Sequence, residues 1–341
     1  MPYSGKHVNQ SSSKKGKAGK AGLIILIILL IITIIACAGM IAINNYLNKI
    51  ERVTDTEVVA PEDATDEIDD TDTEPTEPVV DEDEVEWWEG DALNDDHLIN
   101  ILLVGQDSRT GARERSDAMI LCSINPDTGK VSLISFMRDL YVQMPDGYQD
   151  NRMNAAYAFG GFPFLYEVLY KNFGISVDGG IEVNFDGFES VIDAVGGVDI
   201  ELTSGEAAIV GAGAVEGMNH LNGSQALEYS RIRKIGSDFQ RTERQRTVLQ
   251  AVFNNVKNAD LSTLLSLVNT LIPMVTTDMT NAQILSLATK LLPNISSLQL
   301  SSYRIPADDA YSGATIRGMS VLVPDLELNR KYLQEEYLPL S

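Results

Sequence analysis

The chain has 341 residues, enough for one large or two ordinary domains, and its formal net charge is −23. Its two cysteines, Cys37 and Cys122, fall in unrelated apolar runs, which argues against a disulfide framework, and its three histidines lack the spacing of a zinc site. The acidic balance, without a helix-turn-helix pattern, argues against nucleic acid as a partner.

A basic stretch and a long apolar run open the chain. Residues 1–20 contain five lysines and no acid, and the 23 residues of 21–43 contain no charge. As a helix this run would be about 34 Å long, enough to cross a hydrocarbon core of about 30 Å. We expect a cytoplasmic tail, a transmembrane helix over 21–43 and the remainder outside the cell. The alternative is a cleaved signal peptide, whose apolar core is usually only about 7–15 residues long.

An acid-rich segment follows the apolar run. Residues 51–96 hold 21 Asp or Glu against a single Arg, with Pro and Thr interspersed. Such a composition buries too little apolar surface to offset the entropy of ordering. The sequence therefore predicts an extended, disordered acidic linker over 44–96, which carries most of the net charge of the chain.

From 97 to 341 strand-like and helix-like runs alternate, as in one α/β domain. Apolar runs at 99–105, 118–124 and 131–137 predict strands, and the Pro-Asp-Thr-Gly turn predicts an antiparallel hairpin between the last two. Further strands are expected at 181–185, 196–202, 297–305 and 320–324, and helices at 162–173, 186–195, 241–257, 260–272, 281–293 and 325–337. The alternation favours an α/β fold with a mixed β-sheet covered by helices on both faces, an α/β/α sandwich.

Charged residues gather where the first three strands begin or end. If these strands pair as expected, one end of the sheet collects Asp107, Arg115, Asp117, Arg138 and Asp139. Two carboxylates there suit Mg²⁺, which takes few protein oxygens and leaves other positions to phosphate and water. Arginines beside them suit phosphate oxygens, because a guanidinium donates forked hydrogen bonds. A polar loop with surface ion pairs explains the same spacing equally well.

The stretch RIRKIGSDFQRTERQR, residues 231–246, concentrates positive charge in this acidic chain. Arg231 and Arg233 alternate, so on a strand they would point to the same side. Asp238 is placed to cap the helix that follows. The simplest interpretation of such a charge run is a solvated basic helix face.

The helix after this point argues against a solvated face. Arg241, Gln245, Val248 and Val252 are three or four residues apart, so they share one face. Because the valines belong to the apolar side, we expect Arg241 and Gln245 to point inward from the first turns. A helix N-terminus adds free N–H groups and the positive end of a dipole. An internal anion site is therefore the better explanation of the charge.

Several motifs in order resemble the LytR–CpsA–Psr family of bacterial cell-envelope proteins. They are NILLVGQDSR, ERSDAMILCSINPDTGKVSLISFMRDLYV, NRMNAAYAFGG and HLNGSQALEYSRIRKIGSDFQRTERQRTVLQAV. The resemblance covers about 98–255 strongly and extends to about 338. It implies an extracellular catalytic domain over 97–341 with an α/β/α sandwich. It also implies binding of a polyprenyl pyrophosphate-linked glycopolymer and transfer of its glycosyl phosphate to peptidoglycan.

The resemblance also implies roles for individual residues. Asp107 and Asp117 match the acidic positions associated with Mg²⁺ (or Mn²⁺), and with Arg115 they form the expected catalytic set. The expected pyrophosphate-binding residues are Arg138, Arg152, Arg231, Arg233, Asp238, Arg241 and Gln245. Of these, Arg152 departs from the family pattern, because many members have Lys there. Phe164, Leu165, Val168 and Leu169 would contribute a wall of the lipid pocket, or simply form one face of a core helix.

The residues and the resemblance agree on the chemistry. Phosphoryl transfer needs mainly positioning and charge stabilisation, which arginines and a metal ion supply without a Ser–His or Cys–His nucleophile. Asp107 or Asp117 would accept the proton of the acceptor hydroxyl if that carboxylate is free of the metal ion, and the alternative is metal assistance. We therefore expect a membrane-bound phosphotransferase that acts on a teichoic acid or a capsular or secondary wall polysaccharide. The alternatives are a pyrophosphatase, with water as acceptor, and a glycopolymer-binding protein without activity.

Overall fold

The structure is a computed structural model that describes residues 43–53, 58–66, 77–88, 92–93, 97–105, 115–259 and 272–340. The chain divides into two units, 1–49 and 50–341, and the following description concerns the second. The expected cytoplasmic tail and nearly all of the expected membrane span lie outside the described residues, as does Asp107. No helix among the described residues is both long enough and apolar enough to cross a bilayer.

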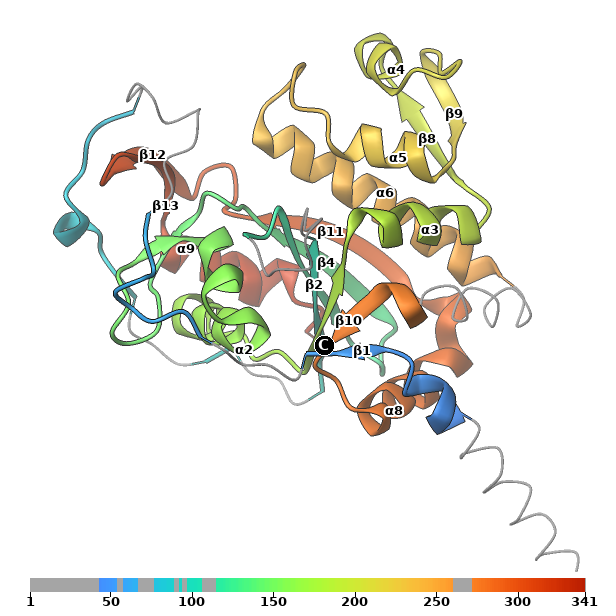
Figure 1. The fold of residues 1–341 in the computed structure, drawn as a ribbon, viewed down its shortest axis with the longest axis horizontal. Helices are drawn as coiled ribbons and strands as arrows, with labels where there is room; N and C mark the ends of the chain where they lie inside the picture. Colours follow the sequence, from blue (N-terminus) through green and yellow to red (C-terminus); the bar gives the residue numbers. More distant parts are fainter. Residues whose placement is uncertain are drawn as a thin grey trace, which may run out of the picture. The chain divides into compact units, whose positions relative to one another are not determined.

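A seven-stranded mixed sheet forms the centre of the unit (Figure 1). Its strands, in spatial order, are β1 (Glu51–Arg52), β10 (Val275–Thr277), β7 (Gly179–Val183), β2 (Ile99–Gly105), β3 (Ala118–Ile124), β4 (Lys130–Phe136) and β11 (Gln299–Ile305). Strand β3 pairs antiparallel with β2 on one side and with β4 on the other. Strand β7 runs parallel to β2, and β11 runs parallel to β4. The expected first three strands and their hairpin are confirmed.

Residue chemistry explains the hairpin. The Asn125 side chain accepts hydrogen bonds from the backbone N–H groups of Asp127 and Thr128, at 3.0 and 3.1 Å. Gly129 closes the turn with φ +72°, a conformation that only glycine adopts without steric strain. The turn therefore fixes the register that brings the start of β3 beside the end of β4.

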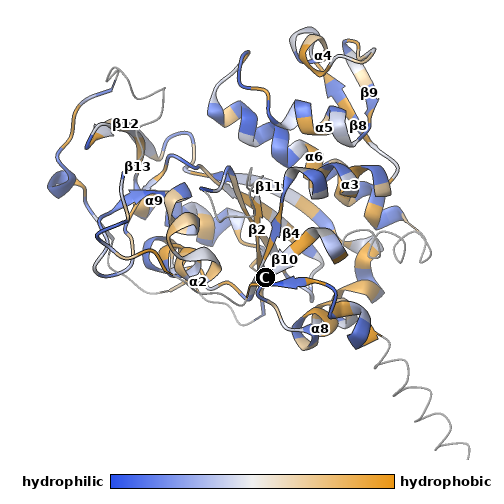
Figure 2. Cartoon of the chain, in the orientation of Figure 1, coloured by the Kyte–Doolittle hydropathy of each residue, from blue (hydrophilic) through white to orange (hydrophobic). Residues whose placement is uncertain are grey.

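Both faces of the sheet are covered by helices. The helices are α2 (Met153–Phe173), α3 (Phe185–Ala194), α4 (Ser204–Val210), α5 (Gly223–Ser230), α6 (Asp238–Asn258), α8 (Asn281–Leu291) and α9 (Leu326–Tyr332). Along β2, Leu102 and Val104 enter a core with α2, whereas Ile101 and Leu103 enter a core with α6 and α8. This alternation explains the apolar strands of the sheet in Figure 2 and confirms the expected mixed α/β fold.

Three two-stranded sheets complete the unit. They are β5 (Tyr141–Val142) with β6 (Asn151–Arg152), β8 (Val198–Leu202) with β9 (Gly217–Leu221), and β12 (Tyr311–Ile316) with β13 (Met319–Pro324). Short helical turns lie at Glu82–Glu84, Ile272–Met274, Leu292–Ser297 and Leu333–Tyr337. The β8–β9 pair shares a separate core with α3, α4, α5 and α6, which stands above one end of the central sheet in Figure 1.

Some elements differ from the expectation. Helix α2 contains the expected helix 162–173 as its second part; a first helical part, from Met153 to a kink where Gly160 and Gly161 have non-helical backbone angles, was not expected. The elements α4, α5, β9 and β12 were not expected. Arg231 and Arg233 follow the end of α5 in a turn, so the strand predicted for them is wrong. The helix predicted at 260–272 falls almost entirely outside the described residues.

The described parts of the acid-rich segment also differ from the expected linker. Strand β1 pairs in parallel with β10, and Val79 forms a β-bridge with Thr315. The carboxylate of Asp66 accepts two hydrogen bonds from the Arg317 guanidinium, at 2.8 and 3.0 Å. Specific partners far along the chain therefore order residues that composition alone assigns to a linker.

Candidate functional site

A cavity of about 550 Å³ lies between the sheet and the helices α3, α5 and α6. Strands β2, β3 and β7 supply one wall, with Leu103, Ile120 and Val183 among its residues. Helix α3 supplies Phe188 and Val191 to the opposite side. A volume of this size is typical of a small-molecule site, and the lining is mostly apolar. The cavity is therefore suited to a long hydrocarbon group.

Polar residues gather at one end of this cavity. They are Asp117, Asn184, Ser230, Arg231, Arg233, Arg241 and Gln245. Asn184 and Ser230 satisfy local backbone groups, because Asn184 caps α3 and Ser230 donates to the Leu227 carbonyl. The other polar residues of this end, among them the three arginines and Gln245, do not cap these backbone groups and line the cavity.

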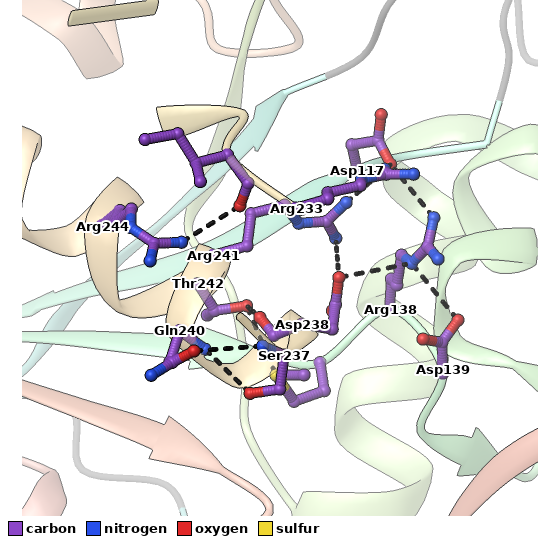
Figure 3. Close-up of polar contacts among 12 residues, drawn as sticks. Asp117, Arg138, Asp139, Arg233, Ser237, Asp238, Gln240, Arg241, Thr242 and Arg244 are labelled. Atoms are coloured by element: carbon purple, nitrogen blue, oxygen red, sulfur yellow. Dashed lines mark hydrogen bonds and ion pairs between the residues drawn. The ribbon is translucent and has the colours of Figure 1, made fainter. Parts of the chain in front are cut away.

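Asp117 lies against arginines at the polar end, as Figure 3 shows. The pairing of Met119 with Phe136 brings the start of β3 beside the end of β4, and so brings Asp117 close to Arg138. One carboxylate oxygen, Asp117 Oδ1, lies 3.3 Å from Arg233 Nη2, 3.6 Å from Arg138 Nη1 and 3.7 Å from Arg241 Nη1. Residues from three distant parts of the sequence therefore meet at one oxygen.

Helix α6 brings a second carboxylate to the same place. Asp238 Oδ1 lies 2.8 Å from Arg241 Nη2 and 3.8 Å from Arg138 Nε. Asp238 is the first residue of the helix and not its cap, contrary to expectation. Ser237 is the cap, and its hydroxyl accepts from the Gln240 N–H while the Gln240 side chain accepts from the Ser237 N–H.

A third carboxylate, Asp139, lies on the other side of Arg138. Its Oδ1 is 3.4 Å from Arg138 Nε and 3.8 Å from Arg152 Nη1. Burial raises the pKa of the Asp139 carboxyl above its usual value, although Arg138, Arg152 and Arg241 act in the opposite direction. Burial likewise lowers the pKa of Arg241, whose side chain is only 3% exposed.

The cluster carries more positive than negative charge. Its arginines are Arg138, Arg152, Arg231, Arg233 and Arg241, and its carboxylates are Asp117, Asp139 and Asp238. Asp238 Oδ2 and Arg241 Nε are buried and make no hydrogen bond to any residue that the structure describes. The excess comes from the exposed Arg231 and Arg233, and Arg241 adds a buried donor without a hydrogen bond among the described residues. Such an arrangement is typical of a site that binds a multiply charged anion.

The structure places the other expected site residues elsewhere or does not describe them. Arg115 donates to Asn154 Oδ1 at 3.3 Å and to the Thr65 carbonyl at 3.2 Å, and it does not line the cavity. The four residues expected at the lipid pocket, Phe164, Leu165, Val168 and Leu169, lie in the core between α2 and the sheet. They form the face of a core helix, which was the alternative interpretation.

Sequence reasoning missed most of the apolar wall. On α6, Leu249 and Val252 line the cavity beyond Gln245, as the helical spacing of Val252 suggested. On α3, the spacing of Phe188, Val191 and Ile192 indicated a buried helix face. It did not indicate which part of the molecule that face would pack against. Only the position of α3 over β2 and β7 turns this face into a cavity wall.

The carboxylates meet part of the requirement for Mg²⁺. No group of three His, Cys, Asp or Glu able to hold a metal ion occurs within the described residues. Mg²⁺ in phosphate sites usually takes only one or two carboxylates and completes its shell with phosphate oxygens and water. Asp117, 37% exposed, and the unsatisfied Asp238 Oδ2 are donors of this type, so the cluster fits Mg²⁺ together with a phosphate ligand.

The profile of the LytR_cpsA_psr family matches residues 57–335. The chain belongs to the LytR–CpsA–Psr family. The match begins inside the acid-rich segment, in agreement with the ordered contacts of its described residues. Within 50–335, only residues 50–56 lie outside the family match.

Relatives of this LytR–CpsA–Psr protein carry names that describe an activity. It is 36% identical over 245 residues to the polyisoprenyl-teichoic acid–peptidoglycan teichoic acid transferase TagU of Oceanobacillus iheyensis, covering 68% of this chain and 73% of that one. It is 37% identical over 170 residues to the protein of the same name from Bacillus mycoides, covering 49% and 55%. The second match thus spans only about half of the relative.

Solved structures of the family share the fold. The structure described as TagT bound to LI-WTA has a TM-score of 0.58 and 25% identity, covering 71% of this chain and 91% of that one. TagV of B. subtilis has a TM-score of 0.56 and 27% identity, covering 73% and 100%. The agreement extends over most of the unit that contains the cavity.

Proposed function

We propose that this protein transfers a glycosyl-phosphate polymer from a polyprenyl pyrophosphate carrier to peptidoglycan. The observation that carries the proposal is the apolar cavity that ends at a positively charged cluster. A polyprenyl chain would occupy the apolar part, and its pyrophosphate would meet Arg138, Arg231, Arg233 and Arg241. Relatives named as teichoic acid transferases support a wall teichoic acid or a similar wall polysaccharide as the polymer.

The reaction replaces a phosphoanhydride bond of the pyrophosphate with a phosphoester bond to the acceptor. A hydroxyl oxygen of the acceptor glycan attacks the phosphorus next to the sugar, the bond from that phosphorus to the bridging oxygen breaks, and polyprenyl phosphate leaves. The proton of the hydroxyl passes to whichever carboxylate, Asp117 or Asp107, is not engaged by the metal ion. The arginines stabilise the charge that builds up on the phosphate oxygens, and burial strengthens this effect.

Mg²⁺ (or Mn²⁺) belongs to the proposal as the cofactor. Asp117 and Asp107 would hold the ion. When bound, it would neutralise charge on the pyrophosphate oxygens. Replacing Asp117 with Asn should abolish metal-dependent turnover, while the apolar wall that binds the lipid remains in place.

The proposal also places the protein in the cell membrane. The uncharged run 21–43 and the lysines before it favour an uncleaved anchor with the catalytic domain outside. Fractionation should recover the intact N-terminus with the membrane. A mature chain that begins after residue 43 and is found in the culture medium would contradict this part.

The test of the activity is product analysis. The full-length chain, in detergent, is incubated with Mg²⁺, a polyprenyl pyrophosphate-linked wall glycan and peptidoglycan oligomers, and the products are identified by mass spectrometry. We expect peptidoglycan bearing the glycan through a phosphodiester, together with polyprenyl phosphate. Release of the glycan phosphate without attachment would show a pyrophosphatase, and an unchanged donor would show a binding protein.

A further inference from the structure

A second cavity, also of about 550 Å³, is lined by other residues than the apolar cavity described above. Its walls come from the acid-rich segment at 78–88, from the β12–β13 hairpin and from the start of α9. The segment and the hairpin lie side by side at the left of Figure 1. This cavity exists only because the segment is ordered against the domain.

Both tryptophans of the chain, Trp87 and Trp88, line this second cavity. Each indole has a partner that fixes it. Trp87 stacks on Tyr141 with ring centroids 5.9 Å apart, and the Arg330 guanidinium lies 3.0 Å from the ring centre of Trp88. Aromatic rings held in this way offer flat apolar surfaces with little loss of entropy on binding, as sugar rings require.

The charged residues of the second cavity all have the same sign. The carboxylates among its lining residues are Glu84, Glu86, Asp325 and Glu327, and its described lining contains no Lys or Arg. Carboxylates accept hydrogen bonds from hydroxyl and amide groups, but they repel phosphates. The chemistry therefore excludes the phosphate-rich donor polymer and suits uncharged sugar rings.

The position of the second cavity relates it to the phosphate cluster. The Leu322 N–H donates to the Asp139 carbonyl at 2.9 Å, and the next residue, Val323, lines the second cavity. Tyr141, which supports Trp87, follows Asp139 by two residues. Asp139, a member of the phosphate cluster, is therefore joined directly to residues that form or support the wall of the second cavity.

We propose that the second cavity binds uncharged sugar units of the glycan that accepts the transferred group. This inference rests on the proposed function, because only an acceptor hydroxyl needs a place beside the phosphate cluster. The tryptophans stack on the sugar faces, and the carboxylates of Glu84 and Glu327 accept hydrogen bonds from sugar hydroxyl and acetamido groups. The acid-rich segment thus forms part of the acceptor site.

The two tryptophans provide a direct measurement of binding. The full-length chain, in a detergent without a sugar headgroup, is titrated with an uncharged β-1,4-linked N-acetylglucosamine oligomer, with no donor present. We expect a saturable change in tryptophan emission, because every tryptophan of the chain lies at the cavity. An emission that does not change would overturn the inference, as would a response only to a cationic amine such as a short lysine peptide.

Variants separate the sugar site from the catalytic cluster. The double variant Glu84→Gln, Glu327→Gln should weaken oligomer binding about tenfold and raise KM for the acceptor glycan by a similar factor, with kcat unchanged. Glu167→Gln, an exposed carboxylate on α2, is the matched control and should change neither value. Melting temperatures verify that the variants fold.

The outcomes also separate this inference from the proposed function. Oligomer binding by the wild-type chain, lost in the double variant, supports the sugar site even if no transfer product forms. If transfer occurs and the double variant has the same KM for the acceptor glycan as wild type, the second cavity is not the sugar site. The proposed function would still stand.

Discussion

Arg233 and Arg241 contact the same oxygen of Asp117, but they differ in exposure. The Arg233 side chain is 54% exposed and contacts only Asp117 among the described residues, whereas Arg241 is 3% exposed and also holds Asp238. An exposed ion pair contributes little to stability, but breaking a buried one leaves a charge without compensation. The two arginines should therefore separate ligand binding from folding.

We expect Arg233→Ala to leave the free energy of unfolding within about 1 kcal/mol of wild type. Loss of one charge-assisted hydrogen bond, worth roughly 1.5–3 kcal/mol, should weaken polyprenyl pyrophosphate binding roughly ten- to hundredfold. Arg241→Ala should instead lower the unfolding free energy by about 3 kcal/mol in the absence of ligand. Urea unfolding and ligand-dependent melting temperatures measure both effects.

Lys234→Ala is the matched control for these variants. It removes one positive charge next to Arg233, from a residue that does not line the cavity. Its affinity for the pyrophosphate should stay close to wild type. If Lys234→Ala and Arg233→Ala weaken binding equally, the ligand responds to total charge and the assignment of Arg233 is incorrect.

These arginines show how far the sequence alone predicted the orientation of single site residues. The periodicity of α6 indicated correctly that Arg241 points inward, because inward valines follow it at helical spacing. Arg231 and Arg233 were expected on one side of a strand, and both do line the cavity, although from a turn. The contacts among Asp117, Arg138 and Arg241 depend on tertiary structure, so their distances were not predictable.

At the scale of elements, a buried ion pair joins α4 to α6 beside the cavity. Arg244 Nε lies 2.6 Å from Glu206 Oε1, and Arg244 Nη1 donates to the Ile232 carbonyl at 3.0 Å. The two side chains are 7% and 11% exposed. Because Ile232 lies between Arg231 and Arg233, the pair also fixes the turn that carries these two arginines.

Glu206→Gln should therefore destabilise the fold by about 3 kcal/mol at pH 7. Burial alone would raise the pKa of Glu206, but hydrogen bonds from Arg244 and Thr203 outweigh it and hold the pKa below its usual value of 4.5. A lowered pKa stabilises the fold above the unfolded-state pKa, and this contribution disappears as the pH falls through the folded-state pKa.

The difference between wild type and Glu206→Gln should then shrink as the pH falls below about 4. Urea unfolding at pH 7 and at pH 3.5 measures it. A difference that is the same at both pH values would mean that the destabilisation arises from packing of the side chain and not from its charge.

The elements themselves were predictable where their signals are local. Long apolar runs gave β2, β3 and β4, and a polar turn gave their hairpin. Helices α4 and α5 were missed although each begins with a capping box, Thr203 with Glu206 and Asn222 with Gln225. The helix 162–173 was predicted correctly, and only the part of α2 from Met153 to the kink at Gly160 and Gly161 was missed.

At the scale of the molecule, one arginine pairs with two carboxylates from separate parts of the acid-rich segment. Arg317 occupies the two-residue turn of the β12–β13 hairpin, with φ 49°. Its guanidinium pairs with Asp66 and Glu82, and it donates to Tyr141 Oη at 3.2 Å. Composition could not reveal this contact, because Asp66 and Arg317 are 251 residues apart in sequence.

We expect Arg317→Ala to release residues 58–66 and 77–88 from the domain. Loss of the charge-assisted hydrogen bonds should lower stability by about 2 kcal/mol, and amide hydrogen exchange in both ranges should accelerate at least about tenfold. Exchange in the central sheet should change less, because the sheet has its own core. Mass spectrometry of peptides after exchange measures each range separately.

Two further variants decide whether Arg317 acts through its shape or only through its charge. Arg317→Lys keeps the charge but lacks the planar fork that pairs with both oxygens of Asp66, so it should restore only part of the protection. Lys290→Ala, an exposed lysine on α8, should leave both ranges as protected as in wild type. If residues 58–66 and 77–88 already exchange freely in the wild-type protein, they form a linker, and the second cavity loses one of its walls.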